Sequence, residues 1–73
     1  HMTQKTQLTP ERARELIRYY KGVASRTEYE YYRTRDEGQN DLHVLALETI
    51  EYLQLAEASL YNIEARRRLT TDD

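Results

Sequence analysis

The spacing of apolar residues constrains the fold of this 73-residue chain more than any other feature. In two long stretches they recur at steps of three and four, which matches the 3.6-residue turn of an α-helix and places each set on one helix face. The sets are Ala13, Leu16, Ile17, Tyr20, Ala24, Thr27 and Tyr31, then Leu42, Leu45, Ala46, Thr49, Ile50, Leu53, Ala56, Leu60 and Ile63. The pattern predicts an all-α protein.

The start of the first helix is marked by Thr9, Pro10 and Glu11. Thr9 can accept a hydrogen bond as the N-cap, and Pro10 suits the first helical position because its missing N–H would be unpaired there anyway. Glu11 places a negative charge beside the positive end of the helix dipole. We therefore predict a helix that begins at Pro10.

The turn between the helices is predicted around Gly38. We expect the first helix to end near Glu37, with Gly38 as its left-handed C-cap. Asn40 or Asp41 would then cap the second helix, which we expect to run to about Leu69.

One segment of the first helix contains conflicting signals. Residues 21–23 (Lys-Gly-Val) resemble a helix stop, and residues 25–28 (Ser-Arg-Thr-Glu) match a capping box that could start a new helix. However, the apolar spacing continues through Gly22 without a change of phase, and a single glycine costs only about 1 kcal/mol inside a helix. We expect a continuous or gently kinked helix, with two short helices as the alternative.

Two helices of similar length joined by a short turn predict an antiparallel helical hairpin. The charge distribution suits this pairing. Residues 1–35 carry eight Lys or Arg against four Glu, whereas residues 36–73 carry three Arg against nine Asp or Glu. Such complementarity favours pairing of the two helices, although each exposed pair contributes only about 0.3–0.5 kcal/mol. Three arginines at positions 66–68 are interpreted as favourable charges at a helix C-terminus.

The length allows one small domain, which we place at residues 9–69. Residues 1–8 are expected to be a disordered lead-in that includes a cloning remnant at His1, and residues 70–73 a disordered tail. The chain contains no cysteine, no signal peptide and no apolar run near the ~20 residues that span a bilayer. We therefore expect a cytoplasmic protein that is not inserted in a membrane.

The second stretch has more apolar residues than one helix contact needs. Its far side carries Val44, Leu47, Leu55, Ala58, Ala65 and Leu69. Burial of a leucine contributes about 1.5–3 kcal/mol, and two helices alone cannot cover both sides. We predict a homodimeric four-helix bundle with Val44, Leu47 and Leu55 in the interface. Alternatively, a different protein covers this stripe, or the chain is a subunit of a larger helical assembly.

No pattern of catalytic, metal-binding or phosphate-binding residues is found. His43 is the one histidine besides His1, and Asn40 stands where a Glu-x-x-His metal motif would need glutamate. The two glycines are sixteen residues apart, which excludes a glycine-rich phosphate loop. We therefore expect neither enzymatic activity nor a cofactor, and interpret His43 as a surface residue or a contact between the helices.

All seven aromatic residues are tyrosines, which suits boundaries between dry and wet surfaces. By helical phase, Tyr20, Tyr31, Tyr52 and Tyr61 are interpreted as core or rim residues. The others point away among arginines, and tyrosine and arginine are enriched among interface anchors. The predicted partner-binding residues are Arg18, Tyr19, Arg26, Tyr29, Tyr32 and Arg33.

We therefore expect a small non-enzymatic protein-interaction module, such as an adaptor, inhibitor or regulator of another protein. The alternative is a nucleic-acid-binding regulator that uses the basic strip of the first helix. This strip consists of Arg14, Arg18, Lys21, Ser25, Arg26, Tyr29, Tyr32 and Arg33. The sequence pI of about 5.7 and the acidic residues Glu11 and Glu15 weigh against this alternative.

Overall fold

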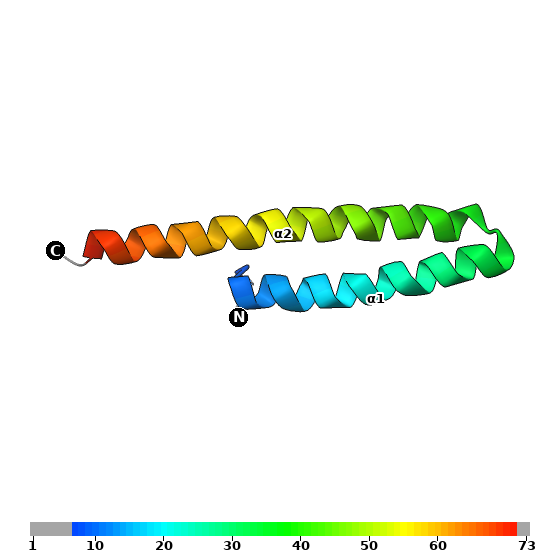
Figure 1. The fold of residues 1–73 in the computed structure, drawn as a ribbon, viewed down its shortest axis with the longest axis horizontal. Coiled ribbons are helices and arrows are strands. Elements are labelled where there is room, and N and C mark those ends of the chain that lie inside the picture. Colours follow the sequence, from blue (N-terminus) through cyan, green and yellow to red (C-terminus); the bar gives the residue numbers. More distant parts are fainter. Residues whose placement is uncertain (1–6, 72–73) are drawn as a thin grey trace, which may run out of the picture.

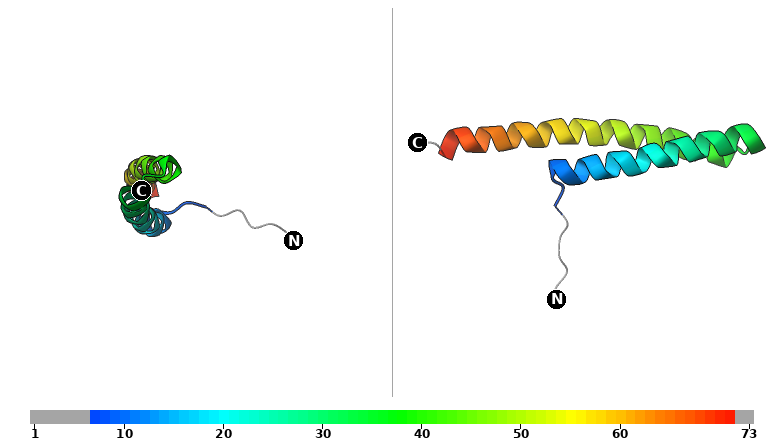
Figure 2. Two further views of the ribbon diagram at one scale, coloured as in Figure 1. Left: turned by 90° about the vertical axis from the view of Figure 1, so that its right-hand side faces the viewer. Right: turned by 60° about the horizontal axis from the view of Figure 1, so that its bottom comes forward.

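Two long helices make up the protein, and they pack side by side as an antiparallel hairpin (Figure 1). The structure is a computed structural model that describes the backbone of residues 7–71. Helix α1 spans Pro10–Thr34 and helix α2 spans Glu37–Thr71. Figure 2 shows, end-on, a single layer of two helices. The predicted all-helical hairpin is confirmed for the described residues, whereas most of the predicted lead-in, and Asp72 and Asp73, lie outside them.

Helix α1 begins as predicted and continues without a break. The Thr9 hydroxyl accepts a hydrogen bond from the Arg12 N–H at 3.1 Å, and Pro10 occupies the first turn. The alternative of two short helices is wrong, because α1 runs through Gly22. The Thr27 hydroxyl of the capping-box sequence is buried and donates to the carbonyls of Val23 and Ala24. The hydrogen-bonding capacity of this hydroxyl is therefore met by carbonyls of the same helix, and no helix break is needed.

The end of α1 differs from the prediction, because Arg35 and not Gly38 adopts the left-handed conformation, with φ 57° and ψ 28°. Its N–H donates to the Tyr31 carbonyl at 2.6 Å. A non-glycine residue pays roughly 1 kcal/mol for this conformation. The Arg35 guanidinium lies 5.6 Å and 5.5 Å from the ring centroids of Tyr31 and Tyr32, and these cation–π contacts offset part of the cost.

The start of α2 is capped by Asp36, so the predicted caps Asn40 and Asp41 are wrong. The Asp36 carboxylate accepts a hydrogen bond from the Gly38 N–H at 2.9 Å. Gly38 lies in the first turn of α2 and has an ordinary negative φ. A Cβ at this position would lie 3.3 Å from the Asp36 carboxylate oxygen, so glycine gives the cap room. The turn is therefore three residues earlier than the glycine signal indicated.

The core between the helices is thin. Its buried apolar residues are Ala13, Ile17, Ala24, Ala46 and Ile50, all on the predicted faces. The outer members of the α2 face, Leu42, Leu45 and Ile63, are instead 49%, 57% and 48% exposed. Their predicted place in the helix contact is wrong, because one neighbouring helix covers only a narrow sector of a stripe this wide.

The two helices are unequal in length, contrary to expectation. With 25 residues in α1 and 35 in α2, α2 is longer by about 15 Å at 1.5 Å per residue. Figure 1 shows this excess as an overhang, where the C-terminal part of α2 runs past the start of α1. Helix α2 continues to Thr71, beyond the predicted end at Leu69.

Neither helix in the described part of the chain combines the length and the apolar character that crossing a membrane requires.

Polar contacts tie the helices together at both ends of the core. Near the turn, the His43 Nδ1 lies 2.8 Å from the Ala24 carbonyl oxygen. At the open end, Arg14 forms an ion pair with Glu57 at 3.2 Å and donates a hydrogen bond to the Tyr61 hydroxyl. His43 is thus a contact between the helices. Because each contact joins a residue of α1 to a residue of α2, both contacts restrict sliding of α2 along α1.

We expect His43→Ala to lower the free energy of unfolding by about 1–2 kcal/mol, from the lost hydrogen bond and the lost ring packing. Urea unfolding followed by circular dichroism measures the change. Asp41→Ala is the control, because Asp41 lies exposed on the same helix. Equal changes in both variants would contradict a specific role for the His43 contact.

Candidate protein-binding surface

The six predicted partner-binding residues all have exposed side chains on α1. Because they fall outside the face that packs on α2, α1 presents them to solvent. Tyr19, Tyr29 and Tyr32 are each more than 60% exposed. These tyrosines therefore do not contribute to the hairpin core.

Three of the six residues meet at one open hollow near the turn. Tyr19, Arg26 and Tyr29 line it together with Val23 of α1 and Leu42 of α2. The remaining lining residues are Ser25, Thr27, Glu30 and Gln39. The apolar periodicity of α2 predicts Leu42 in the helix contact and does not reveal its part in this hollow. Its position at the edge of the broad α2 stripe was the available signal.

The hollow combines an apolar floor with charged and aromatic rims. Val23 and Leu42 provide apolar surface, and the Tyr19 ring meets the Tyr20 ring edge to face with centroids 5.1 Å apart. This contact restricts the orientation of Tyr19. Arg26 adds a guanidinium at the rim. Such a surface suits an apolar or aromatic side chain that has an acidic neighbour.

The other three predicted residues lie outside this hollow. The Tyr32 ring makes a cation–π contact with the Arg35 guanidinium, and Arg33 forms an ion pair with Glu30. Arg18 lines a separate hollow that also contains Lys21. Of the six predicted partner-binding residues, three therefore line one hollow together and three lie apart from it.

The basic strip considered for nucleic acid is partly neutralised within the chain. Arg14 is paired with Glu57 and lies 5.7 Å from the Tyr61 ring centroid. The hydrogen bond to the Tyr61 hydroxyl, followed by the contact with Glu57, raises the pKa of the Arg14 guanidinium above its ordinary value. Arg33 is paired with Glu30. These contacts leave fewer cations for phosphates and weaken the nucleic-acid hypothesis.

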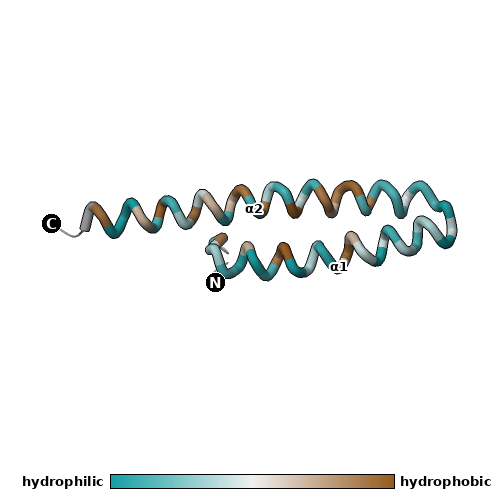
Figure 3. The backbone as a smooth tube through the Cα atoms, in the orientation of Figure 1, coloured by the Kyte–Doolittle hydropathy of each residue, from teal (hydrophilic) through white to brown (hydrophobic). Residues whose placement is uncertain are grey.

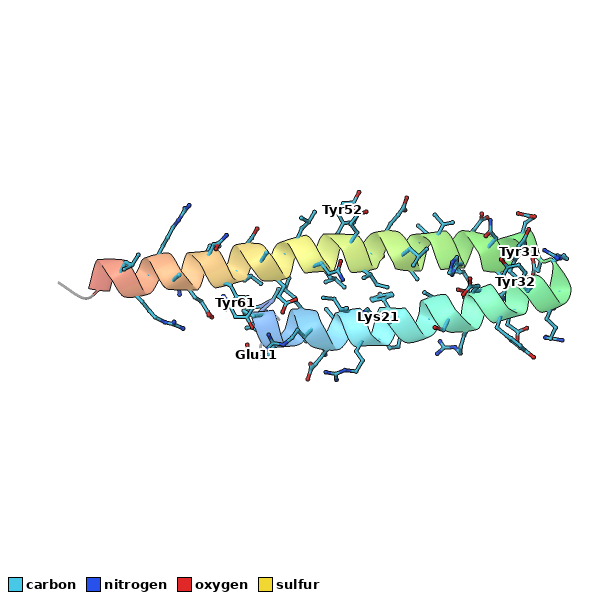
Figure 4. All side chains as sticks on the ribbon, in the orientation of Figure 1. Glu11, Lys21, Tyr31, Tyr32, Tyr52 and Tyr61 are labelled. Atoms are coloured by element: carbon cyan, nitrogen blue, oxygen red, sulfur yellow. The ribbon has the colours of Figure 1, made fainter. Side chains whose placement is uncertain are left out.

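Helix α2 carries hydrophobic residues along most of its length, except at its hydrophilic start beside the turn, whereas α1 is mostly hydrophilic (Figure 3). Val44, Leu47 and Leu55, the predicted interface residues, are exposed. Tyr52 is 70% exposed and points away from α1 (Figure 4), so its interpretation as a core or rim residue is wrong. Helical phase had placed Tyr52 at the margin of the inward face, and the single neighbouring helix does not reach it.

Several of these exposed apolar side chains form a second apolar surface, which we call the Tyr52 face. It consists of Leu42, Leu45, Tyr52 and Ile63 on α2 with Tyr19 and Val23 on α1. The α2 members are spaced by multiples of helical turns and therefore lie on one side of that helix. Leu42 joins them to α1, because it shares the hollow with Tyr19 and Val23.

The described residues contain no cluster of three or more His, Cys, Asp or Glu side chains that could hold a metal ion. Comparisons with protein-family models, with curated proteins and with solved structures give no significant match.

Proposed function

We propose that this chain is a protein-interaction module, which self-associates into a four-helix bundle and binds a different protein through the hollow at Tyr19, Arg26 and Tyr29. The observation that carries the proposal is this hollow, where an apolar floor is shared by both helices and bordered by tyrosine and arginine. An adaptor, inhibitor or regulator acts through surfaces of this kind.

The chemistry of the hollow favours a protein as the ligand. Tyrosine offers a large contact area at little cost in side-chain entropy, and arginine offers several donors to a carboxylate. The Val23 and Leu42 side chains can bury an apolar anchor of the partner. Phosphate recognition would instead need several unpaired cations close together, and Arg26 is the one arginine in the lining.

Self-association is supported by the imbalance between core and surface. The buried core contains three alanines and two isoleucines, while the surface carries many large apolar side chains on α2. A chain of this size is marginally stable alone, because it buries only about 60% of its unfolded surface, less than larger domains do. Pairing of two hairpins would bury these side chains and supply the missing stabilisation.

Photocrosslinking tests the binding site. We expect a benzoylphenylalanine placed at Tyr29 to form an adduct with a different protein in a lysate of the source cells. The same probe at Tyr32 is the control, because Tyr32 is as exposed as Tyr29 but lies outside the hollow.

Two further substitutions sharpen this test. Arg26→Ala should abolish the adduct formed from position 29, whereas Arg18→Ala should leave it unchanged, because Arg18 is exposed on the same helix but lines a separate hollow. Equal labelling from positions 29 and 32, or insensitivity to Arg26→Ala, would reject the hollow as the site. Salt-sensitive retention of the protein on DNA or RNA would favour the nucleic-acid alternative.

A further inference from the structure

We infer that the Tyr52 face is the self-association surface and that a second, antiparallel copy of this chain covers it. The two-fold axis crosses α2 beside Tyr52. This inference rests on the self-association in the proposed function and specifies its face and its register.

The apolar residues of α2 on this face can pair with the same residues of a second, antiparallel α2. Their stripe comprises Leu42, Leu45, Thr49, Tyr52, Ala56, Leu60 and Ile63, at steps of three and four. In the antiparallel register centred beside Tyr52, Leu42 meets Ile63, Leu45 meets Leu60 and Thr49 meets Ala56 of the second copy. Each Tyr52 lies next to its own counterpart. The small residues Thr49 and Ala56 on both sides leave room for the two rings, as close packing requires.

A hollow lies at each end of this stripe, and both positions are compatible with the same antiparallel register. One lies near the turn and contains Val23 and Leu42, and the other lies at the open end and contains Leu8, Leu60 and Ile63. Antiparallel pairing sets the turn end of each hairpin over the open end of the second copy, so that Ile63 of the second copy packs beside Leu42 as a further apolar wall of the hollow near the turn. The rest of that hollow, with Val23, Arg26 and Tyr29, remains open to a different protein.

The middle of the face contains tyrosines from both helices. Arg14 of α1 contacts Glu57 of α2, so the antiparallel hairpin sets Tyr19 at about the level of Tyr52. Tyr19 therefore lies near the proposed two-fold axis on the α1 side. Its ring meets the second copy's α1 close to the half-buried Leu16. Both layers of the bundle thus have apolar contacts at the centre.

The size of the face is adequate for a specific dimer. The stripe from Leu42 to Ile63 is about 30 Å long, and two packed helices are about 20 Å wide. Each copy then contributes roughly 600 Å², and the total of about 1,200 Å² is at the lower end of specific interfaces. The antiparallel register also gives the overhang of α2 a neighbour, the second copy's α2, which no part of its own α1 supplies (Figure 1).

Charge favours the antiparallel arrangement over a parallel one. Helix α2 starts with acidic residues, among them Glu37 and Asp41, and its last turns carry the arginines at positions 66–68. Antiparallel pairing sets the acidic start of each α2 beside the basic end of the other. Parallel pairing would set acid beside acid and arginine beside arginine.

The opposite stripe with Val44, Leu47 and Leu55 is less suited to a two-helix-wide contact. Glu51 and Asn62 interrupt it. Gln54, two turns beyond Leu47, lines a hollow with Arg14, Arg18, Lys21 and Glu57, so the adjoining surface of α1 is charged. On the Tyr52 face, by contrast, α1 continues the apolar surface.

Disulfide crosslinking tests the inference cleanly, because the chain has no cysteine. We expect Tyr52→Cys to form a disulfide-linked dimer on mild oxidation, on the order of a hundredfold faster than Leu55→Cys on the far side. Both positions are more than 60% exposed in the hairpin, so both variants should fold. Circular dichroism under reducing conditions checks this.

The register is tested with single-cysteine variants at the ends of the stripe. Leu42→Cys and Ile63→Cys should crosslink to each other when mixed, and neither should crosslink to itself. Crosslinking of Leu42→Cys to itself would indicate a parallel dimer, and faster crosslinking of Leu55→Cys would indicate the opposite stripe. Either result overturns this inference but leaves self-association intact. A monomer at all concentrations in sedimentation would remove self-association from the proposed function as well.

Discussion

Replacing Ala46 with aspartate is expected to unfold the hairpin at room temperature. The Ala46 side chain is 2% exposed, so the new carboxylate would be enclosed between the helices. Desolvation of an unpaired buried charge costs several kcal/mol, and the loss of helix propensity adds to it. Small domains have about 5 kcal/mol of stability in total. Far-UV circular dichroism should therefore show loss of most of the helical signal.

Leu47→Asp is the matched control for this substitution. Leu47 is the next residue on α2 and is 49% exposed, so its aspartate stays in water. We expect helicity to be retained, with a change in unfolding free energy within about 1 kcal/mol. Similar loss of helicity in both variants would mean that helix propensity, and not burial against α1, decides the outcome.

The combined substitution Leu45→Glu with Tyr52→Glu is expected to raise the dissociation constant of the proposed homodimer by about a hundredfold or more. Both side chains are mostly exposed in the hairpin and would be buried only by the second copy. Losing their burial on two copies removes roughly 3 kcal/mol or more, and each 1.4 kcal/mol is a factor of ten. The two glutamates at position 52 would also lie next to each other beside the two-fold axis.

Sedimentation velocity over a range of concentrations measures this effect directly. The thermal midpoint of the unsubstituted protein should rise with concentration, as expected when association stabilises the fold, and that of the variant should not. Val44→Glu with Leu55→Glu adds the same charges to the opposite stripe and should leave the dimer intact. Dissociation by this control pair alone would place the interface on the opposite stripe.

The tyrosines illustrate how far helical phase predicts a surface. Phase correctly separates Tyr20 and Tyr31, which are half-buried, from Tyr19 and Tyr29, which are exposed. It failed for Tyr52, because the apolar stripe of α2 is wider than the sector that a single neighbouring helix covers. A helical projection orders residues around an axis, but it does not say where along that axis, or how broadly, a neighbour makes contact.

The turn shows a different reason for failure. Gly38 carries the strongest stop signal in this region, yet α1 ends at Thr34 and Arg35 adopts the left-handed conformation. The result depends on several small terms acting together: the Asp36 cap and the cation–π contacts of Arg35 with two tyrosines. Each is worth about 1 kcal/mol, which is similar to the cost it offsets, so the sequence pattern alone could not rank them.

The sequence by itself determined that this chain forms two helices, where the first begins, and which residues lie at the centre of each inward face, but not how wide those faces are. These features depend on hydrogen bonds and spacing within a few residues of each other. The tertiary structure decided the overhang of α2, the His43 contact with Ala24 and the hollow shared by Tyr19 and Leu42. These features depend on the register between residues about twenty or more positions apart, which local periodicity leaves undetermined because each turn of one helix could pack against several turns of the other.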